Sequence, residues 1–277
     1  MMTGRVQRLK SKFLNTRPNI TPERLLLATE AYKKYAGDAV PLFRAKVLAY
    51  VLDNLSVTIH DEELIVGAPT YTLRGASLFP EYTSVDWLIE EIPEFPTRPM
   101  DQIDVTDKDK ETILKCLDEY WKGKAIEDLL PEVLPDDVYE LFTNGIVDLG
   151  LTNTTSGETV PDYKSLMSKG LQGYIDDCRA KIMKEPTGTL EAHSKIDFWK
   201  ACIIACEAVI RFAGRYADKA EELAMNEMDL KRKSELLTIA ANCRKVPANS
   251  PSGFYEALQF VWFIHLVFHI EGPTTAC

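Results

Sequence analysis

Apolar residues recur every three or four positions along most of this chain, the spacing that places them on one face of an α-helix. The clearest helix start is Thr21-Pro22-Glu23, where a threonine N-cap, a proline and an early acid precede an apolar stripe. Gly37 is suited to end that helix. The same spacing predicts further helices over residues 41–55, 106–121, 162–185, 194–226, 228–245 and 253–270. Short connections between the long helices favour antiparallel neighbours.

Three stretches lack this helical spacing. Residues 56–82 read as extended, and the apolar run 64–66 lies between acidic residues and Gly67, which predicts a short β-strand. Prolines make residues 93–105 a predicted loop. Residues 124–160 are also broken by prolines and include a polar loop around Gly157.

The most apolar run occupies residues 257–270. A membrane-spanning helix needs about 20 mainly apolar residues. This run is shorter, and it carries Gln259, His265 and His269. We interpret it as a buried helix, or as a helix that leads into a strand, and we expect no contact with a membrane.

Composition places the chain among ordinary soluble proteins. Of its 277 residues, 45% are apolar and 27% are charged. The net charge of -10 argues against a nucleic-acid partner, because phosphate contacts require clustered Lys and Arg. The N-terminus has no apolar stretch that would act as a signal peptide, so we expect a cytoplasmic location. No linker-like segment divides the chain, and residues 1–277 are predicted to form one domain without an internal boundary.

Two pairs of side chains at helical spacing are candidates for metal binding. Cys202 and Cys206 are four residues apart, as are His265 and His269. A metal site normally needs three or four ligands, and neither pair has an obvious third. Buried structural thiols and core histidines are the commoner outcome. A metal protein that uses His265 and His269 remains an alternative.

Other nucleophile and nucleotide motifs are missing from the sequence. It contains neither a glycine-rich phosphate loop nor a Gly-x-Ser-x-Gly elbow. Glu158 stands out because it lies in a polar loop, and loops on a rigid scaffold carry a large share of binding residues. An exposed structural acid is still the commoner role for such a residue.

Several stretches that together span almost the whole chain carry a family resemblance. They include residues 8–18, 23–32, 44–48, 61–67, Phe79-Pro80-Glu81-Tyr82, Cys206-Glu207-Ala208, Arg215-Tyr216-Ala217, Cys243 and residues 254–265. In this order they resemble the N-terminal part of glycyl radical enzymes, in the glycerol-dehydratase-like branch of the pyruvate formate-lyase superfamily. The resemblance implies a helix-rich α/β fold, namely part of a ten-stranded α/β barrel. This chain would supply mostly the outer helices and the first strand or strands.

The resemblance also implies radical chemistry on a small polar substrate, carried out by residues outside this chain. The thiyl cysteine, its glutamate base and the radical glycine of the family would all lie beyond residue 277, and Cys277 does not match the thiyl motif. No catalytic residue is therefore expected here, and the fragment alone is expected to be inactive. The implied partners are the remainder of the polypeptide, a second copy in a homodimer, and an activase that uses S-adenosylmethionine and an iron–sulfur cluster.

Two positions resemble the substrate pocket of that family. Gly157-Glu158, followed by Asp162-Tyr163, is similar to a Gly-His-x-x-x-Asp-Tyr motif, with Glu158 in place of the histidine. Thr275 and Ala276 stand where a polar His-Ser pair is usual. An acid would favour a cation or a hydrogen-bond donor, so we expect a different substrate, such as an amine or another small polyol. A non-catalytic helical interaction module is the alternative from another class.

Overall fold

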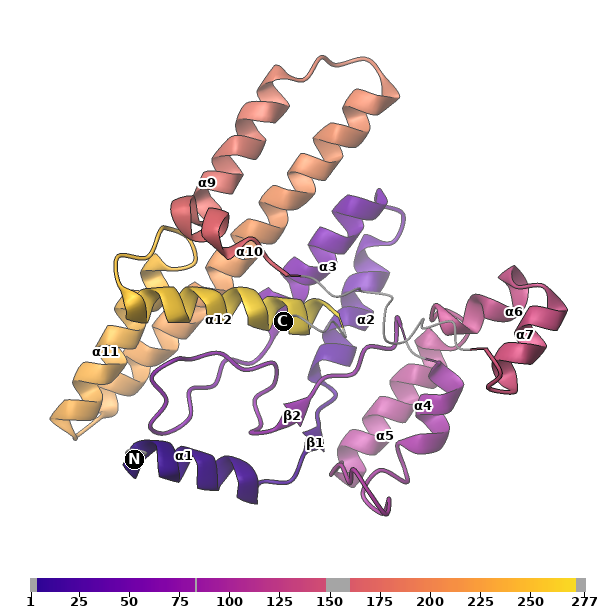
Figure 1. The fold of residues 1–277 in the computed structure, drawn as a ribbon, viewed down its shortest axis with the longest axis horizontal. Coiled ribbons are helices and arrows are strands. Elements are labelled where there is room, and N and C mark those ends of the chain that lie inside the picture. Colours follow the sequence, from indigo (N-terminus) through magenta and orange to yellow (C-terminus); the bar gives the residue numbers. More distant parts are fainter. Residues whose placement is uncertain (1–3, 83, 148–159, 273–277) are drawn as a thin grey trace.

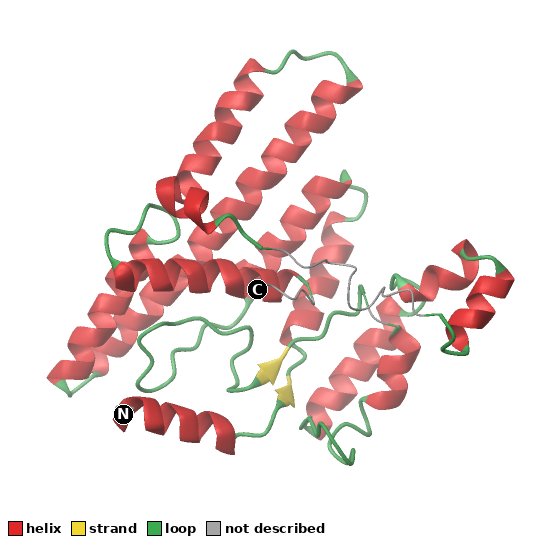
Figure 2. Ribbon diagram, in the orientation of Figure 1, coloured by secondary structure: helices red, strands yellow, loops and turns green. Residues whose placement is uncertain are grey.

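Helices make up nearly all of the regular structure (Figure 2). The computed structural model describes residues 4–82, 84–147 and 160–272. Its long helices are α1 (Gly4–Asn15), α2 (Glu23–Tyr35), α3 (Val40–Asn54), α9 (Tyr163–Lys184), α10 (Leu190–Asn226), α11 (Leu230–Lys245) and α12 (Phe254–Glu271). Shorter helical elements are α4 (Val85–Glu91), α5 (Asp107–Cys116), the π-helical turn η1 (Leu117–Trp121), the 3-10 turn η2 (Glu127–Leu129), α6 (Leu130–Val133) and α7 (Asp136–Thr143).

Helix α10 is the longest of the described helices. It has 37 residues and is therefore about 55 Å long. It packs against α3, α9 and α11, and it forms a long hairpin with α9 (Figure 1). Its buried face is rich in alanine, which lets the neighbouring helices approach closely; the buried alanines are Ala192, Ala201, Ala208, Ala213, Ala217, Ala220 and Ala224. The long helices and the antiparallel neighbours that the spacing indicated are therefore present.

Two hydrophobic clusters form the interior, and α2 contributes to both. The larger cluster joins α3 and α9 to α12, with Phe212 and Phe263 fully buried in it. The smaller one joins α4, α5 and η1 around Trp121. Ala28 of α2 lies in the larger cluster and Leu25, one helical turn earlier, lies in the smaller. Helix α2 thus lies between the two clusters.

The strand predicted at residues 64–66 was wrong. The described strands are β1 (Asn19–Ile20) and β2 (Gly75–Ala76), which pair in parallel. The chain bends at residues 64–65, and the hydrogen-bond partners of Leu64 and Val66 are side chains of α12 rather than another strand. Gln259 bonds both backbone groups of Val66, with its Oε1 2.9 Å from the N–H nitrogen and its Nε2 2.8 Å from the carbonyl oxygen.

Gly67 allows this segment to lie directly on α12. Its φ of +132° is strained for any residue with a side chain. A Cβ there would also lie 2.8 Å from Leu266 Cδ2 and 3.0 Å from Trp262 Nε1. The indole Nε1 instead donates to the Gly67 carbonyl at 2.9 Å. The close approach fixes the path of the segment across the helix.

Three further predictions need correction. Helix α2 begins at Glu23, and Thr21 makes no side-chain cap; its buried hydroxyl has no partner among the described residues. The region 124–160 is less broken than expected, since it holds η2, α6 and α7. Helix α9 is interrupted at Gly170, next to the loop of residues 247–248. The apolar run 257–270, by contrast, is helical throughout as part of α12.

Candidate functional site

The three predicted substrate-binding residues, Glu158, Thr275 and Ala276, lie outside the described residues. The structure does describe the chain next to them. Residues 160–162 lead into α9, and Gly272 comes directly after the end of α12. These two helix ends are therefore the described parts of the candidate site.

The end of α12 is held by Arg24, a side chain of α2 that is only 3% exposed. Its Nε donates to the Ile270 carbonyl at 2.7 Å, and Nη2 donates to the Glu271 carbonyl at 3.1 Å. Nη1 donates to the Leu78 carbonyl at 3.0 Å. Glu81 accepts from Nη2 at 2.6 Å and from Nη1 at 3.3 Å. These five contacts match the five N–H donors of a guanidinium group.

This arrangement provides hydrogen-bond donors to backbone carbonyls that have no partner within the helix. The last four carbonyls of an α-helix have no partner within the helix, and a cation near them also interacts favourably with the helix dipole. Arg24 supplies both the donors and the charge. Its guanidinium lies 3.9 Å from the centre of the Phe79 ring. With the Glu81 side chain 5% exposed, the ion pair is shielded from water on both sides.

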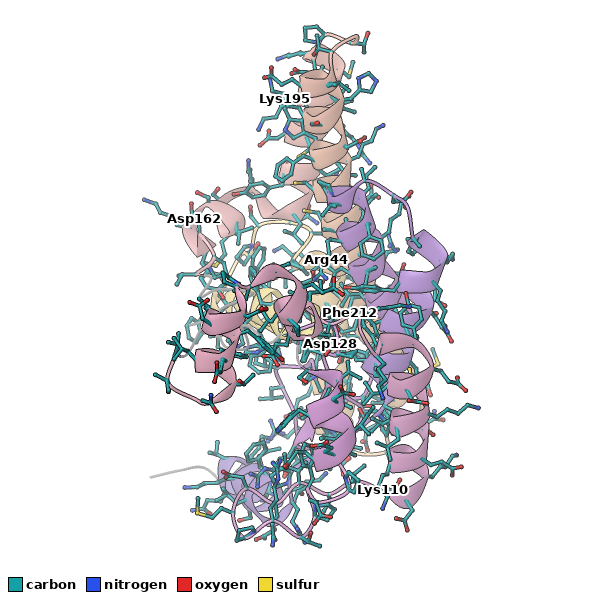
Figure 3. The ribbon with its side chains drawn as sticks, turned by 90° about the vertical axis from the view of Figure 1, so that its right-hand side faces the viewer. Arg44, Lys110, Asp128, Asp162, Lys195 and Phe212 are labelled. Atoms are coloured by element: carbon teal, nitrogen blue, oxygen red, sulfur yellow. The ribbon has the colours of Figure 1, made fainter. Side chains whose placement is uncertain are left out.

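A second arginine holds the Glu271 side chain. Arg44 of α3, labelled in Figure 3, binds the Glu271 carboxylate and donates to the hydroxyls of Tyr82 at 2.7 Å and Tyr32 at 2.9 Å. Burial raises the pKa of Glu271 above its usual value, and the positive charge of Arg44 opposes that rise. Burial also raises the pKa of Tyr82, so its hydroxyl is protonated near neutral pH. Residues of α2, α3 and the segment before α4 therefore meet at the end of α12.

The start of α9 is capped by its own sequence. The Asp162 side chain, labelled in Figure 3, accepts from the Ser165 N–H at 3.1 Å, which satisfies one of the open donors of the first turn. Hydrogen bonding to Ser165, first from its side chain and then from its backbone N–H, lowers the pKa of Asp162. Tyr163 packs against the larger hydrophobic cluster. The Asp-Tyr pair of the predicted pocket motif therefore fixes where α9 begins.

His265 and His269 lie against each other on α12. Their Nε2 atoms are 3.1 Å apart, so one ring must carry the proton that the other accepts. Burial, followed by the neighbouring His265, lowers the pKa of His269. Across residues 4–82, 84–147 and 160–272, no group of three His, Cys, Asp or Glu side chains is arranged to hold a metal ion. The pair thus has no third ligand in that part of the chain.

Cys202 and Cys206 are half-buried on α10. Burial raises the pKa of Cys202, and it raises the pKa of Cys206 to about 12. Cys202 also shares a hydrogen bond with Cys178 of α9. Near neutral pH these groups are mostly protonated thiols, which are weaker nucleophiles than thiolates.

Sequence reasoning gave no role to Arg24, Glu81 or Arg44, although all three fall in the family-like stretches. A signal for Arg24 was present. Arg24, Ala28 and Ala31 are spaced i, i+4 and i+7, which puts the arginine on the buried face of its helix. Charged residues are almost never fully buried unless they are paired. The partner carboxylate, 57 positions away, could not be found from spacing.

The family model described as "Pyruvate formate lyase-like" matches residues 1–277. The chain belongs to the pyruvate formate lyase-like family of glycyl radical enzymes. The enzymes of this family carry a glycyl radical that an activase installs. The resemblance proposed from the sequence and the helix-rich fold class are both confirmed.

Two curated relatives are each 34% identical in sequence to this chain over the matched residues. An isethionate sulfite-lyase of Nitratidesulfovibrio vulgaris is 34% identical over 98% of this chain and 34% of its own length. A (2S)-3-sulfopropanediol dehydratase of Klebsiella oxytoca is 34% identical over 97% of this chain and 33% of its own length. The chain thus spans about a third of the length of the curated relatives it matches.

A solved structure of the same family is closely similar. The glycerol-bound form of the B12-independent glycerol dehydratase from Clostridium butyricum has a TM-score of 0.93 and 35% identity. The match covers 98% of this chain and 34% of that one. The family likeness therefore extends over the two clusters and the end of α12.

Among the described helices, none is long and apolar enough to cross a bilayer.

Proposed function

We propose that this chain is the N-terminal third of a cytoplasmic glycyl radical lyase or dehydratase that acts on a small polar substrate. In that enzyme it supplies outer helices and part of the wall of the substrate pocket, as one unit without an internal domain boundary. The observation that carries the proposal is the match over nearly the whole chain, at a TM-score of 0.93, to one third of a glycerol-bound dehydratase. The relatives named for isethionate and 3-sulfopropanediol support a small polar substrate.

The chemistry in this proposal belongs to residues outside residues 1–277. A glycyl radical, installed by a partner activase with S-adenosylmethionine and an iron–sulfur cluster, generates a thiyl radical on a cysteine. The thiyl abstracts a hydrogen atom from the substrate, and a glutamate near it acts as the base. The present chain binds and orients, and it does not catalyse on its own. A homodimer is the proposed assembly.

Glu158, Thr275 and Ala276 are the proposed substrate contacts of this chain. They derive from the motif resemblance, in which a histidine and a His-Ser pair are replaced. Glu158 introduces a negative charge, and in a water-poor pocket such a charge strongly favours a cationic or hydrogen-bond-donating substrate. A small amine or polyol fits this requirement.

The test of the function is a radical and product measurement on the complete enzyme. The full-length protein is treated anaerobically with its activase and S-adenosylmethionine, and the glycyl radical is counted by EPR spectroscopy. Activated enzyme is then offered glycerol, isethionate and 2-aminoethanol. We expect a radical signal and turnover of at least one compound, while residues 1–277 alone give neither. Absence of the radical from the complete, folded protein would refute the proposal.

The test of the pocket assignment is Glu158→Gln in the complete enzyme. Removing the charge should raise KM for a cationic substrate by about tenfold or more, a loss of at least about 1.4 kcal/mol. Glu158→Asp is the matched control, because it keeps the charge while shortening the side chain. Equal KM values in wild type and Glu158→Gln would remove Glu158 from the pocket.

A further inference from the structure

His265 and His269 form a pair of imidazoles on one face of α12. They are four residues apart, so one helical turn separates them and their side chains are neighbours on the helix surface. Their ring centres lie 4.5 Å apart and their Nε2 atoms lie 3.1 Å apart. Both side chains are half-buried, so neither ring is sealed inside the protein.

The distance between the two nitrogens suits a single metal ion. A transition-metal ion such as Zn²⁺ binds an imidazole nitrogen at about 2.0–2.1 Å. Two such bonds to nitrogens 3.1 Å apart enclose an angle of about 98° at the metal. That angle lies between the roughly 90° of neighbouring octahedral ligands and the roughly 109° of tetrahedral ligands. Both coordination geometries are therefore open to the pair without a change in the helix backbone.

The rings also face the space that an ion would occupy. In the hydrogen bond between them, the Nε2 atom of one ring is directed at the Nε2 atom of the other. The χ2 torsion of histidine is soft, so a small rotation of each ring would aim both lone pairs at one point. Burial, followed by the neighbouring His265, lowers the pKa of His269, which favours the neutral imidazole that binds metals. A metal ion would replace the proton that the two nitrogens share.

We propose that His265 and His269 form a binding site for a divalent transition-metal ion, which the two Nε2 atoms hold while water completes its coordination. No third His, Cys, Asp or Glu side chain joins the pair among the residues that the structure describes. Imidazole ligands select Cu²⁺, Ni²⁺ and Zn²⁺, whereas Mg²⁺ and Ca²⁺ prefer oxygen ligands. The inference concerns two side chains of α12 alone and is independent of the proposed function.

The chain provides two matched controls for this site. Cys202 and Cys206 repeat the spacing of four residues on α10, but burial raises the pKa of both thiols, and the thiolate that binds metals is therefore scarce near neutral pH. His193 is an exposed histidine of α10, and its Nδ1 lies 3.0 Å from the Thr189 carbonyl oxygen. Cys206→Ser thus tests spacing without imidazole, and His193→Gln tests imidazole without a partner ring.

The experiment titrates Ni²⁺ into the complete, metal-free enzyme near neutral pH, before activation, and follows binding by calorimetry. Loss of an outer-shell partner alone costs about 10–100-fold in metal affinity, so loss of one of the two ligands should weaken binding by at least about tenfold. We therefore expect the wild type to bind one equivalent of Ni²⁺ that is weakened to this extent or lost in His265→Gln and in His269→Gln. The variants His193→Gln and Cys206→Ser should retain it, and Zn²⁺, but not Mg²⁺, should compete for it.

Hydrogen exchange locates the bound ion. Ni²⁺ should slow the exchange of backbone amides at residues 265–272 in the wild type and leave it unchanged in His269→Gln. Equal Ni²⁺ binding in the wild type and both glutamine variants overturns the proposal, and so does an equal loss in His193→Gln. If neither glutamine variant folds, the wild type alone decides, because unchanged exchange at residues 265–272 on addition of Ni²⁺ also overturns the proposal.

Discussion

At its first turns α12 supplies side chains that bind the backbone of a loop, whereas at its last turn its own backbone is bound by side chains of other elements. Gln259 bonds both backbone groups of Val66, and Tyr255 donates to the Leu64 carbonyl. At the other end the donor is the Arg24 guanidinium. At both ends of α12, hydrogen bonds between side chains and backbone groups take the place of the backbone–backbone hydrogen bonds of regular secondary structure.

The contacts at the two ends of α12 differ in charge. This difference predicts how much stability is lost when a side chain is substituted at each end. The loop is held by a neutral amide, 1% exposed, whose loss leaves two unpaired neutral groups. The helix end is held by a buried ion pair, and removing one partner leaves an uncompensated charge out of water. The ionic end should therefore be the more fragile of the two, even though each end uses a similar number of hydrogen bonds.

The largest expected effect is that of Glu81→Ala. Without the carboxylate, Arg24 remains buried with its charge unpaired, and the free energy of unfolding should fall by about 3–5 kcal/mol. Chemical denaturation measures this loss. Asp53→Ala is the matched control, because Asp53 accepts two bonds from Arg211 in an exposed pair and should cost at most about 1 kcal/mol. Similar losses in both variants would show that burial of the Arg24 pair has no energetic consequence.

The next effect is that of Gln259→Leu, which keeps the size of the side chain and removes its polar atoms. The N–H and carbonyl of Val66 would then be buried without partners, and the free energy of unfolding should fall by about 2–4 kcal/mol. Gln172→Leu on α9 provides the comparison, since that amide bonds Asp176 in an exposed position. Hydrogen exchange at residues 64–68 should rise in Gln259→Leu alone. Protection that stays at the wild-type level there would contradict the role of Gln259.

The same comparison explains how much could be predicted from the sequence. Helices α9 to α12 are predictable from local periodicity, because each buries a face that its own spacing defines. The prediction of a strand at residues 64–66 was wrong because side chains satisfy the backbone there, and Gln259 lies 193 positions from Val66. The network at the end of α12 was missed for the same reason. The family resemblance predicted the fold, whereas residue spacing could not predict the hydrogen bonds between Arg24 and its partners.

The smallest expected effect concerns the pair His265 and His269, which lies in the second half of α12. The pKa of His269 is lowered, first by burial and then by His265. The unfolded chain therefore takes up a proton at a higher pH than the folded one does, so this contribution to stability is lost as the pH falls from about 7 towards the lowered pKa. Because the pair is partly solvated, the change should stay below about 1 kcal/mol. Denaturation curves at pH 7.5 and pH 5.5, values set about one unit either side of the ordinary histidine pKa, should show a smaller pH dependence for His269→Gln than for wild type. Identical pH dependence in the two proteins would mean that His269 titrates alike in the folded and unfolded states.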